Sequence, residues 1–255
     1  MRRVVFNQKG GVGKSTITAN LAAISASQGL RTLVLDLDAQ GNTTRYLLGN
    51  GADGLETSVA DFFNQTLSFT FNPKNAGEFI YETPFENLHL MPSSPALDEL
   101  HGKLESRYKI YKLRDALDAL AANYDRIYID TPPALNFYTR SALIASQRCL
   151  IPFDCDDFSR RALYALMDNV KEIQADHNRE LQVEGIVVNQ FQPRASLPQK
   201  VVAELIAEGL PVLQPYLSSS VKMKESHERA LPMIHLDAKH KLTQEFVALH
   251  DGLAS

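Results

Sequence analysis

The chain has 255 residues, of which 44% are hydrophobic and 22% are charged, and its formal net charge is −4. This composition is that of an ordinary folded protein and excludes a largely disordered chain. The slight acidic excess argues against a general polycation that coats nucleic acid, but it leaves room for a local basic patch. Two cysteines, Cys149 and Cys155, are too few for a disulfide framework or a four-thiolate metal site.

The sequence offers no pattern that would direct the chain to a membrane or out of the cell. The first apolar run, residues 4–6, is far shorter than the roughly 7–15 residues of a signal-peptide core. No window reaches the ~18 uninterrupted apolar residues of a membrane span. Residues 239–253 can form an amphipathic helix, whose mixed charge favours packing on its own domain over membrane anchoring. We therefore expect a cytoplasmic protein without stable membrane association.

Short apolar runs alternate along the chain with longer stretches of helical period. The predicted strands are residues 4–6, 32–37, 88–91, 127–129, 149–153, 183–188 and 212–213. Helical periodicity is clearest over residues 161–175, and it recurs over 15–28 and 113–120. Apolar strands alternating with helices predict an α/β fold: a doubly wound, mostly parallel sheet with helices on both faces. Since no repeat or linker divides the chain, we expect residues 1–255 to form one domain.

Residues 61–85 depart from this rhythm because they are rich in phenylalanine and tyrosine. One interpretation is a short helix and a small hairpin that pack onto the domain. The other is an exposed aromatic surface that binds a partner protein. The sequence leaves both interpretations open.

Residues 9–16 read KGGVGKST and follow the first predicted strand directly. Phosphate binds where backbone N–H groups converge at a helix N-terminus, and small residues such as Gly10, Gly11 and Gly13 let the backbone come close. Lys14 is then placed to reach the β- and γ-phosphates of a nucleotide, and the Ser15 hydroxyl to ligate Mg²⁺. The usual loop pattern begins with glycine where this chain has glutamine; a second lysine, residue 9, is the more specific signal.

Carboxylates end two of the predicted strands. The segment LDLDAQGN contains Asp36 and Asp38, which we expect on one side of the strand because side chains alternate. The segment IYIDTPP places Asp130 at the end of another apolar strand. Ligands of doubly wound folds bind at the carboxyl edge of the sheet, so three carboxylates there indicate magnesium and water chemistry.

These three segments resemble the deviant Walker A, A′ and B motifs of the ParA/MinD ATPases, in particular the ParA-type partition ATPases. The resemblance covers nearly the whole chain and implies ATP and Mg²⁺ as ligands. It implies that Lys9 reaches across an ATP-sandwich homodimer to the partner's phosphates, and that Asp38 positions the attacking water. Asp36 and Asp130 would support the Mg²⁺ together with Ser15. The nucleotide site would comprise Lys9, Gly10, Gly11, Val12, Gly13, Lys14, Ser15, Thr16 and Asn189.

Asn189 ends a predicted strand and resembles the residue that contacts the base in these ATPases; a plain turn asparagine is the alternative. The segment SVKMKES resembles the basic segment through which ParA dimers grip DNA. On that resemblance we expect Lys222, Lys224 and Arg194 to contact DNA phosphates.

The function that follows is a positioning ATPase that binds nonspecific double-stranded DNA in its ATP-bound dimer, so that it associates with the nucleoid. A ParB-like partner would stimulate hydrolysis and release it. We expect no additional N-terminal DNA-reading domain, because the first strand begins almost at Met1. The alternatives are a membrane-cycling MinD-type or flagellar-number regulator, a metabolic enzyme such as a cobyrinic acid amide synthase, and an iron–sulfur relative that would use Cys149 and Cys155. The cargo stays open.

Overall fold

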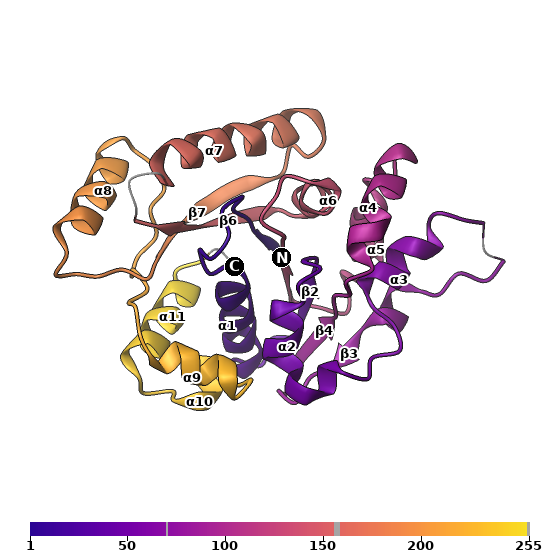
Figure 1. Ribbon diagram of the computed structural model, residues 1–255, viewed down its shortest axis with the longest axis horizontal. Coiled ribbons are helices and arrows are strands. Elements are labelled where there is room, and N and C mark those ends of the chain that lie inside the picture. The colour runs from indigo at the N-terminus through magenta and orange to yellow at the C-terminus, as the bar shows by residue number, and fades with distance from the viewer. Residues whose placement is uncertain (70, 156–158, 254–255) are drawn as a thin grey trace.

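Seven strands form one sheet in the computed structural model, which describes residues 1–69, 71–155 and 159–253 (Figure 1). The strands are β1 (Arg2–Val5), β2 (Thr32–Asp36), β3 (Tyr81–Glu82), β4 (Leu88–Met91), β5 (Arg126–Asp130), β6 (Arg148–Asp154) and β7 (Gln182–Asn189). They lie in the order β3-β4-β2-β5-β1-β6-β7, and every neighbouring pair is parallel except β3 with β4. The predicted mostly parallel sheet is confirmed.

Helices cover both faces of this sheet. They are α1 (Lys14–Ser27), α2 (Asn42–Leu48), α3 (Val59–Gln65), α4 (Leu97–Ser106), α5 (Lys112–Leu120), α6 (Phe137–Ala145), α7 (Ser159–Asp176), α8 (Ser196–Ala207), α9 (Lys222–Glu228), α10 (Met233–Leu236) and α11 (Lys241–Asp251). Figure 1 shows α1 with α9–α11 on one side and α6 and α7 on the other. Among the described residues, none of the helices combines the length and the apolar character that crossing a membrane requires.

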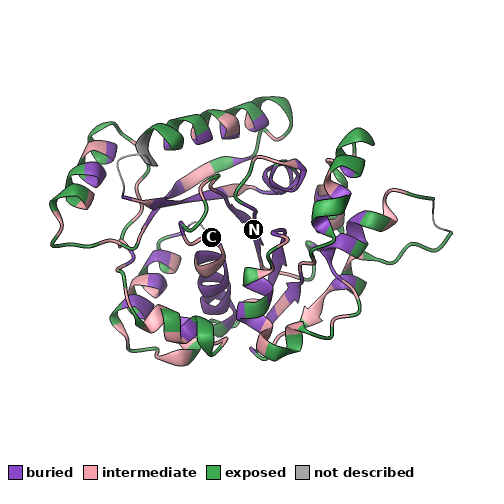
Figure 2. Cartoon of the chain, viewed as in Figure 1, coloured by how far each residue is buried: buried purple, intermediate pink, exposed green. Residues whose placement is uncertain are grey.

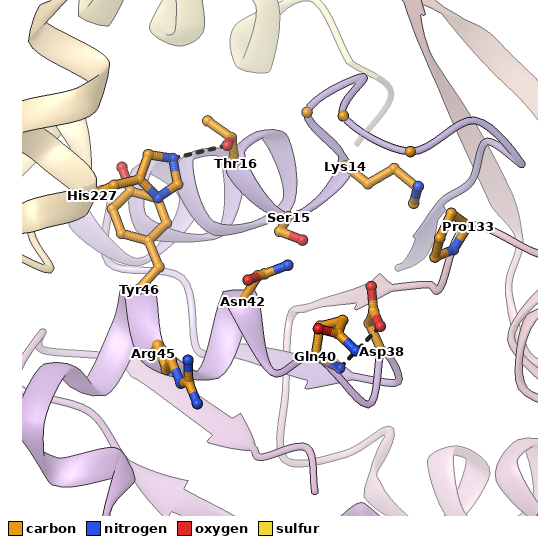
Figure 3. A pocket seen from close by; sticks show the side chains of 13 residues that line it. Lys14, Ser15, Thr16, Asp38, Gln40, Asn42, Arg45, Tyr46, Pro133 and His227 are labelled. Atoms are coloured by element: carbon orange, nitrogen blue, oxygen red, sulfur yellow. Dashed lines mark hydrogen bonds between the residues drawn. The ribbon is translucent and has the colours of Figure 1, made fainter. Parts of the chain in front are cut away.

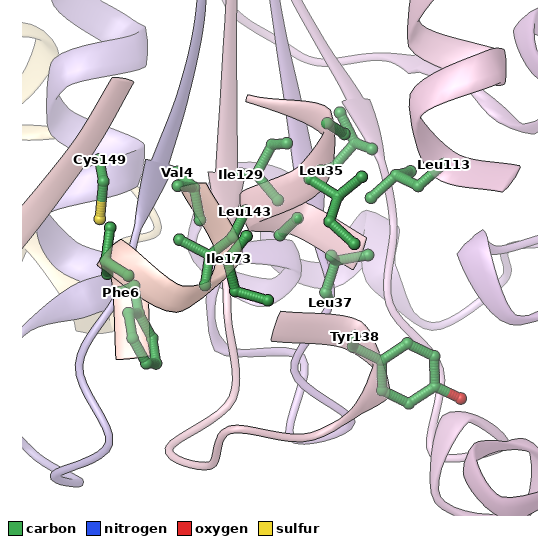
Figure 4. Packing of buried hydrophobic residues seen from close by; sticks show 14 of the residues in the cluster. Val4, Phe6, Leu35, Leu37, Leu113, Ile129, Tyr138, Leu143, Cys149 and Ile173 are labelled. Atoms are coloured by element: carbon green, nitrogen blue, oxygen red, sulfur yellow. The ribbon is translucent and has the colours of Figure 1, made fainter. Parts of the chain in front are cut away.

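Except in β3 and at the start of β7, most strand residues are buried, as Figure 2 shows. Their alternating side chains belong to two hydrophobic clusters. Val4 and Ile129 pack with Leu113 and Leu143 in the cluster of Figure 4, under α4–α7. Val5, Val34 and Tyr128 belong to the second cluster, under α1 and α11. Burial on both faces explains why these strands read as continuous apolar runs in the sequence.

The predicted strand at residues 212–213 is wrong. Val212 makes only an isolated bridge to Ile186 of β7. Its segment runs beside the β7 edge, where Ile186 N donates to Pro211 O at 2.8 Å and Leu213 N donates to Ile186 O at 2.9 Å. An added Cβ on Gly185 would lie 2.3 Å from Leu213 Cγ, so the glycine permits this close approach. Proline cannot donate to a ladder, and the prolines at 211 and 215 keep the pairing short.

The aromatic segment at residues 61–85 contains α3, a 3₁₀ turn (Ala76–Phe79) and β3, which pairs with β4. The rings of Phe62, Phe63 and Phe79 are buried against one another and against α6. Phe69 and Phe71 differ, since they are 87% and 96% exposed. The segment therefore adds to the core at its base and presents two aromatic rings to solvent at its tip.

Candidate active site

The chain turns sharply between β1 and α1, at the carboxyl edge of the sheet. Gly11 and Gly13 adopt left-handed backbone angles, with φ of 77° and 92°, which side-chain-bearing residues rarely adopt. Gly13 is the residue before α1, so the loop leads directly into the helix N-terminus. Around Gly10, by contrast, an added Cβ would meet no atom within 4 Å. This backbone has the form of a phosphate-binding loop.

The two lysines of the loop have different surroundings. Lys14 is buried, and its Nζ donates to the carbonyl oxygen of Lys9 at 3.1 Å, across the loop. Burial lowers the pKa of Lys14, against the opposing effect of Asp130 and Asp38. Lys9 is partly exposed, and its Nζ lies 3.6 Å from Asp154 Oδ2 at the end of β6. Lys14 therefore belongs to the interior of the loop, whereas Lys9 lies where a second molecule can approach.

A pocket of about 540 Å³ opens over the loop (Figure 3). Its walls come from the phosphate loop, the turn after β2, α2, the turn after β5, and α9. The lining residues are Gly10, Gly11, Gly13, Lys14, Ser15, Thr16, Asp38, Gln40, Asn42, Arg45, Tyr46, Pro133 and His227. The pocket thus brings together the predicted loop residues and Asp38.

Asp36 and Asp38 have different surroundings, and their expected position on one side of the strand stays a prediction. The strand β2 ends at Asp36, and Leu37 N still donates to Asp130 O on the neighbouring strand at 3.1 Å. Asp36 is fully buried and accepts hydrogen bonds from Thr44 N and Thr44 Oγ1, both at 2.8 Å. Asp38 instead lines the pocket, where its Oδ1 accepts from Gln40 N at 3.1 Å. Burial raises the pKa of Asp38.

Asp130 and Asp36 are register partners on the adjacent strands β5 and β2. Burial, followed by the charge of Asp130, raises the pKa of Asp36 to about 8. Burial also raises the pKa of Asp130 to about 6, against hydrogen bonding by the Ser15 and Thr43 hydroxyls. Two buried carboxyl groups this close disfavour each other's ionisation. A cation would relieve that cost.

The residues around Asp130 fit Mg²⁺. Its Oδ2 accepts from Thr43 Oγ1 at 2.7 Å, whereas its Oδ1 is buried and has no hydrogen-bond partner among the described residues. Mg²⁺ in nucleotide sites is held by one or two carboxylates together with hydroxyl groups, water and phosphate oxygens. Ser15, Asp130 and Asp36 can supply the protein's share. In the described part of the chain there is no cluster of three or more His, Cys, Asp or Glu suited to a metal.

Asn189 lies against the phosphate loop. Its Nδ2 donates to Val12 O at 2.9 Å, and an added Cβ on Gly13 would lie 2.3 Å from that same nitrogen. Asn189 also lines a second pocket, of about 250 Å³, together with Ser218–Ser220, Met223, Lys224 and Thr16. The two pockets share Gly11, Gly13 and Thr16, so one elongated ligand can occupy both.

The basic residues predicted to contact DNA lie in three different settings. Lys222 begins α9 and pairs with Glu225, with Nζ and Oε2 2.9 Å apart. Lys224 is exposed and lines the pocket next to Asn189. Arg194 is exposed beside a third hollow, formed by residues 191–195, 218–220 and 240–242, which shares residues 218–220 with the smaller pocket. Lys222 and Arg194 therefore line neither pocket at the phosphate loop, while Lys224 lines the smaller one.

Sequence reasoning missed Tyr46 and His227. Their rings stack with centroids 4.1 Å apart and an interplanar angle of 24°, at the wall of the larger pocket. They come from α2 and α9, which lie far apart in sequence, and neither belongs to a phosphate-binding motif. No local signal marks them, because only the fold brings them to the loop.

A phosphate loop at the head of α1, with buried carboxylates at the ends of β2 and β5, defines the class of P-loop nucleoside triphosphatases. A family model described as an AAA domain matches residues 3–183. The chain is 33% identical to the chromosome partitioning protein ParA of Myxococcus xanthus over 96% of this chain and 84% of that protein. It is 30% identical to the sporulation initiation inhibitor protein Soj of Bacillus subtilis over 98% of this chain and 97% of that protein.

Among solved structures, the chain is similar to cobyrinic acid a,c-diamide synthase of Mycobacterium smegmatis, crystallised with ADP and magnesium. The TM-score is 0.83 at 25% identity, over 98% of this chain and 92% of that one. The site and these similarities together show to which family the chain belongs. The chain belongs to the ParA/MinD family of ATPases.

Proposed function

We propose that this chain is a partition or positioning ATPase that binds Mg²⁺·ATP, dimerises around it, and holds nonspecific double-stranded DNA until hydrolysis releases it. The observation that carries the proposal is that the loop contains two lysines in different surroundings. Lys14 is buried inside the loop, whereas Lys9 is partly exposed at its rim. The chromosome partitioning proteins among its relatives support DNA as the ligand that the dimer holds.

In this proposal the loop amides and Lys14 bind the phosphates, and Lys9 of one protomer supplies positive charge to the phosphates held by the other. Asp38, which faces the pocket, orients the attacking water. When bound by Ser15 with support from Asp130 and Asp36, Mg²⁺ would neutralise charge on the phosphate oxygens. Because the site is complete only in the dimer, hydrolysis depends on assembly. The base would occupy the smaller pocket beside Asn189.

For DNA binding we propose Lys222 and Arg194, which lie outside the nucleotide pockets, as phosphate contacts. The position of Lys224 at the smaller pocket argues for a nucleotide contact instead. A ParB-like protein is the proposed stimulator of hydrolysis, as the partition relatives suggest.

The test is retention of two unrelated DNA duplexes on filters with ATP or ADP, over a range of salt concentrations. Retention with ATP alone supports the proposal, whereas no ATP-dependent binding refutes it. Lys222→Glu should weaken binding to both duplexes and flatten the slope of log affinity against log salt by about 2, for one lost contact in each subunit. Lys171→Glu is a matched control, because Lys171 also forms an ion pair with a residue three positions away in its own helix. Its Nζ lies 3.2 Å from Asp168 Oδ1.

A metabolic role is the second candidate, favoured by the similarity to the diamide synthase fold over nearly the whole chain. Such an enzyme would bind nucleotide but has no use for Lys222 or Arg194 on the outer surface. ATP-dependent DNA retention separates the two candidates.

A further inference from the structure

Thr16 lies where the two nucleotide pockets meet. It lines both of them, and it is the last residue of the KGGVGKST loop. A nucleotide that fills both pockets therefore lies beside the Thr16 hydroxyl. Phosphate oxygens at neutral pH act mainly as hydrogen-bond acceptors, so the hydroxyl helps only if its proton points toward them.

His227 contacts this hydroxyl from the opposite wall. Its Nε2 lies 3.0 Å from Thr16 Oγ1, as the dashed line in Figure 3 marks. The hydrogen bond can run in two directions. If Nε2 is unprotonated, Thr16 gives its proton to the imidazole and has none for a ligand. If Nε2 carries the proton, Thr16 accepts, and its own proton is available to the nucleotide.

Tyr46 and its hydrogen-bond partners hold the imidazole of His227 in place. Tyr46 stacks on it at 4.1 Å, and the Tyr46 hydroxyl lies 2.5 Å from Ser226 Oγ and 3.1 Å from Asn20 Nδ2. The same Asn20 Nδ2 donates to Thr16 O at 2.9 Å. Asn20 and Tyr46 thus hold both Thr16 and His227, and this restricts the position of the hydroxyl relative to the imidazole.

We propose that His227, held by Tyr46, is a positioning residue for the nucleotide: it donates from Nε2 to the Thr16 hydroxyl and turns that hydroxyl's proton toward the phosphates. This inference rests on the proposed nucleotide binding. Burial lowers the pKa of His227, so the neutral ring, which carries one N–H, is the form present at neutral pH. The choice between its two tautomers is then what decides whether Thr16 can donate.

The first test is calorimetric titration of the full chain with Mg²⁺ and a non-hydrolysable ATP analogue. Loss of one neutral hydrogen bond predicts that His227→Ala binds about fivefold more weakly. His227→Gln keeps an N–H donor and should restore affinity to within about twofold of the unmodified chain. The matched control is His235→Ala, since His235 stacks on Phe85 at 4.5 Å and does not line either nucleotide pocket. It should leave affinity unchanged.

Equal affinity of His227→Ala and the unmodified chain would overturn the proposal. So would failure of His227→Gln to restore binding, because the role would then be that of a packed ring. If the unmodified chain does not bind the analogue, the proposed nucleotide site fails along with this inference. If it binds the analogue but no DNA, the partition function fails while the assignment of His227 stands.

A second measurement determines the tautomer of His227 directly. Nitrogen chemical shifts of the ¹⁵N-labelled imidazoles report which ring nitrogen carries the proton, and His227→Gln identifies the signal of His227 by its loss. With the analogue bound, we expect the Nε2–H tautomer of His227. The Nδ1–H tautomer would refute the proposal, because the Thr16 proton would then point away from the nucleotide.

Discussion

The close contact between Gly13 and Asn189 gives a quantitative prediction for Gly13→Ala. The φ of 92° at Gly13 places an L-residue in a left-handed conformation, which costs about 1–2 kcal/mol. The new Cβ would also lie 2.3 Å from Asn189 Nδ2 and displace it from Val12 O, so a hydrogen bond of about 1 kcal/mol is lost. Together these effects should lower the free energy of unfolding by about 2–3 kcal/mol.

Urea denaturation measures this loss, and a double-mutant cycle separates its two causes. In an Asn189→Ala background the clash is absent, so Gly13→Ala should cost only the backbone strain of about 1–2 kcal/mol. Gly54→Ala is the control, because Gly54 has no atom within 4 Å of an added Cβ and no left-handed φ. Equal costs of Gly13→Ala in the two backgrounds, or a cost no larger than that of Gly54→Ala, would refute the reasoning.

Other substitutions test the remaining parts of the site. Lys14→Ala should abolish ATP binding in calorimetry, because the buried ammonium is lost; an affinity within about twofold of the unmodified chain would contradict its role. Asp38→Ala should still bind ATP but hydrolyse it very slowly, so light scattering should find a persistent dimer with ATP rather than a monomer. Gly10→Val should keep ATP binding, since the space at Gly10 is open, but lose dimerisation and DNA binding; DNA retention at full strength would refute this. The raised pKa values of Asp36 and Asp130 mean that the folded chain binds more protons than the unfolded chain. Without nucleotide, the free energy of unfolding should therefore fall as the pH rises from about 4 to about 8. Asp36→Asn should remove most of that slope in urea titrations, and an unchanged slope would count against the pair.

The sequence predicts the position and the backbone form of the phosphate loop well because they depend on local rules. Gly11 and Gly13 are needed for the left-handed turns, and Lys14 follows them at a fixed distance. Asp130 ends a strand whose apolar character is itself a consequence of burial on both faces. Chemistry that is carried by neighbouring residues in one segment can be inferred from that segment alone.

The errors and omissions arise where the tertiary structure decides. The pattern LDLD does not distinguish Asp36, which Thr44 binds in the interior, from Asp38, which lines the pocket. Tyr46 and His227 meet only because α9 packs against α2. Lys222 and Lys224 look equivalent in sequence, yet one forms an ion pair and the other lines a pocket. In each case the deciding contact joins segments that no short-range pattern relates.

The segment beside β7 has a consequence for solubility. A sheet edge with unpaired N–H and C=O groups is a template for pairing with another chain. Here residues 211–217 form hydrogen bonds with backbone groups at the outer edge of β7. Leu213 N donates to Ile186 O, and Leu217 N donates to Val188 O, both at 2.9 Å. The opposite edge, β3, is only two residues long. Both margins of the sheet are thus poor templates for edge-to-edge aggregation, and a bulky residue in place of Gly185 should weaken this protection by pushing Leu213 away.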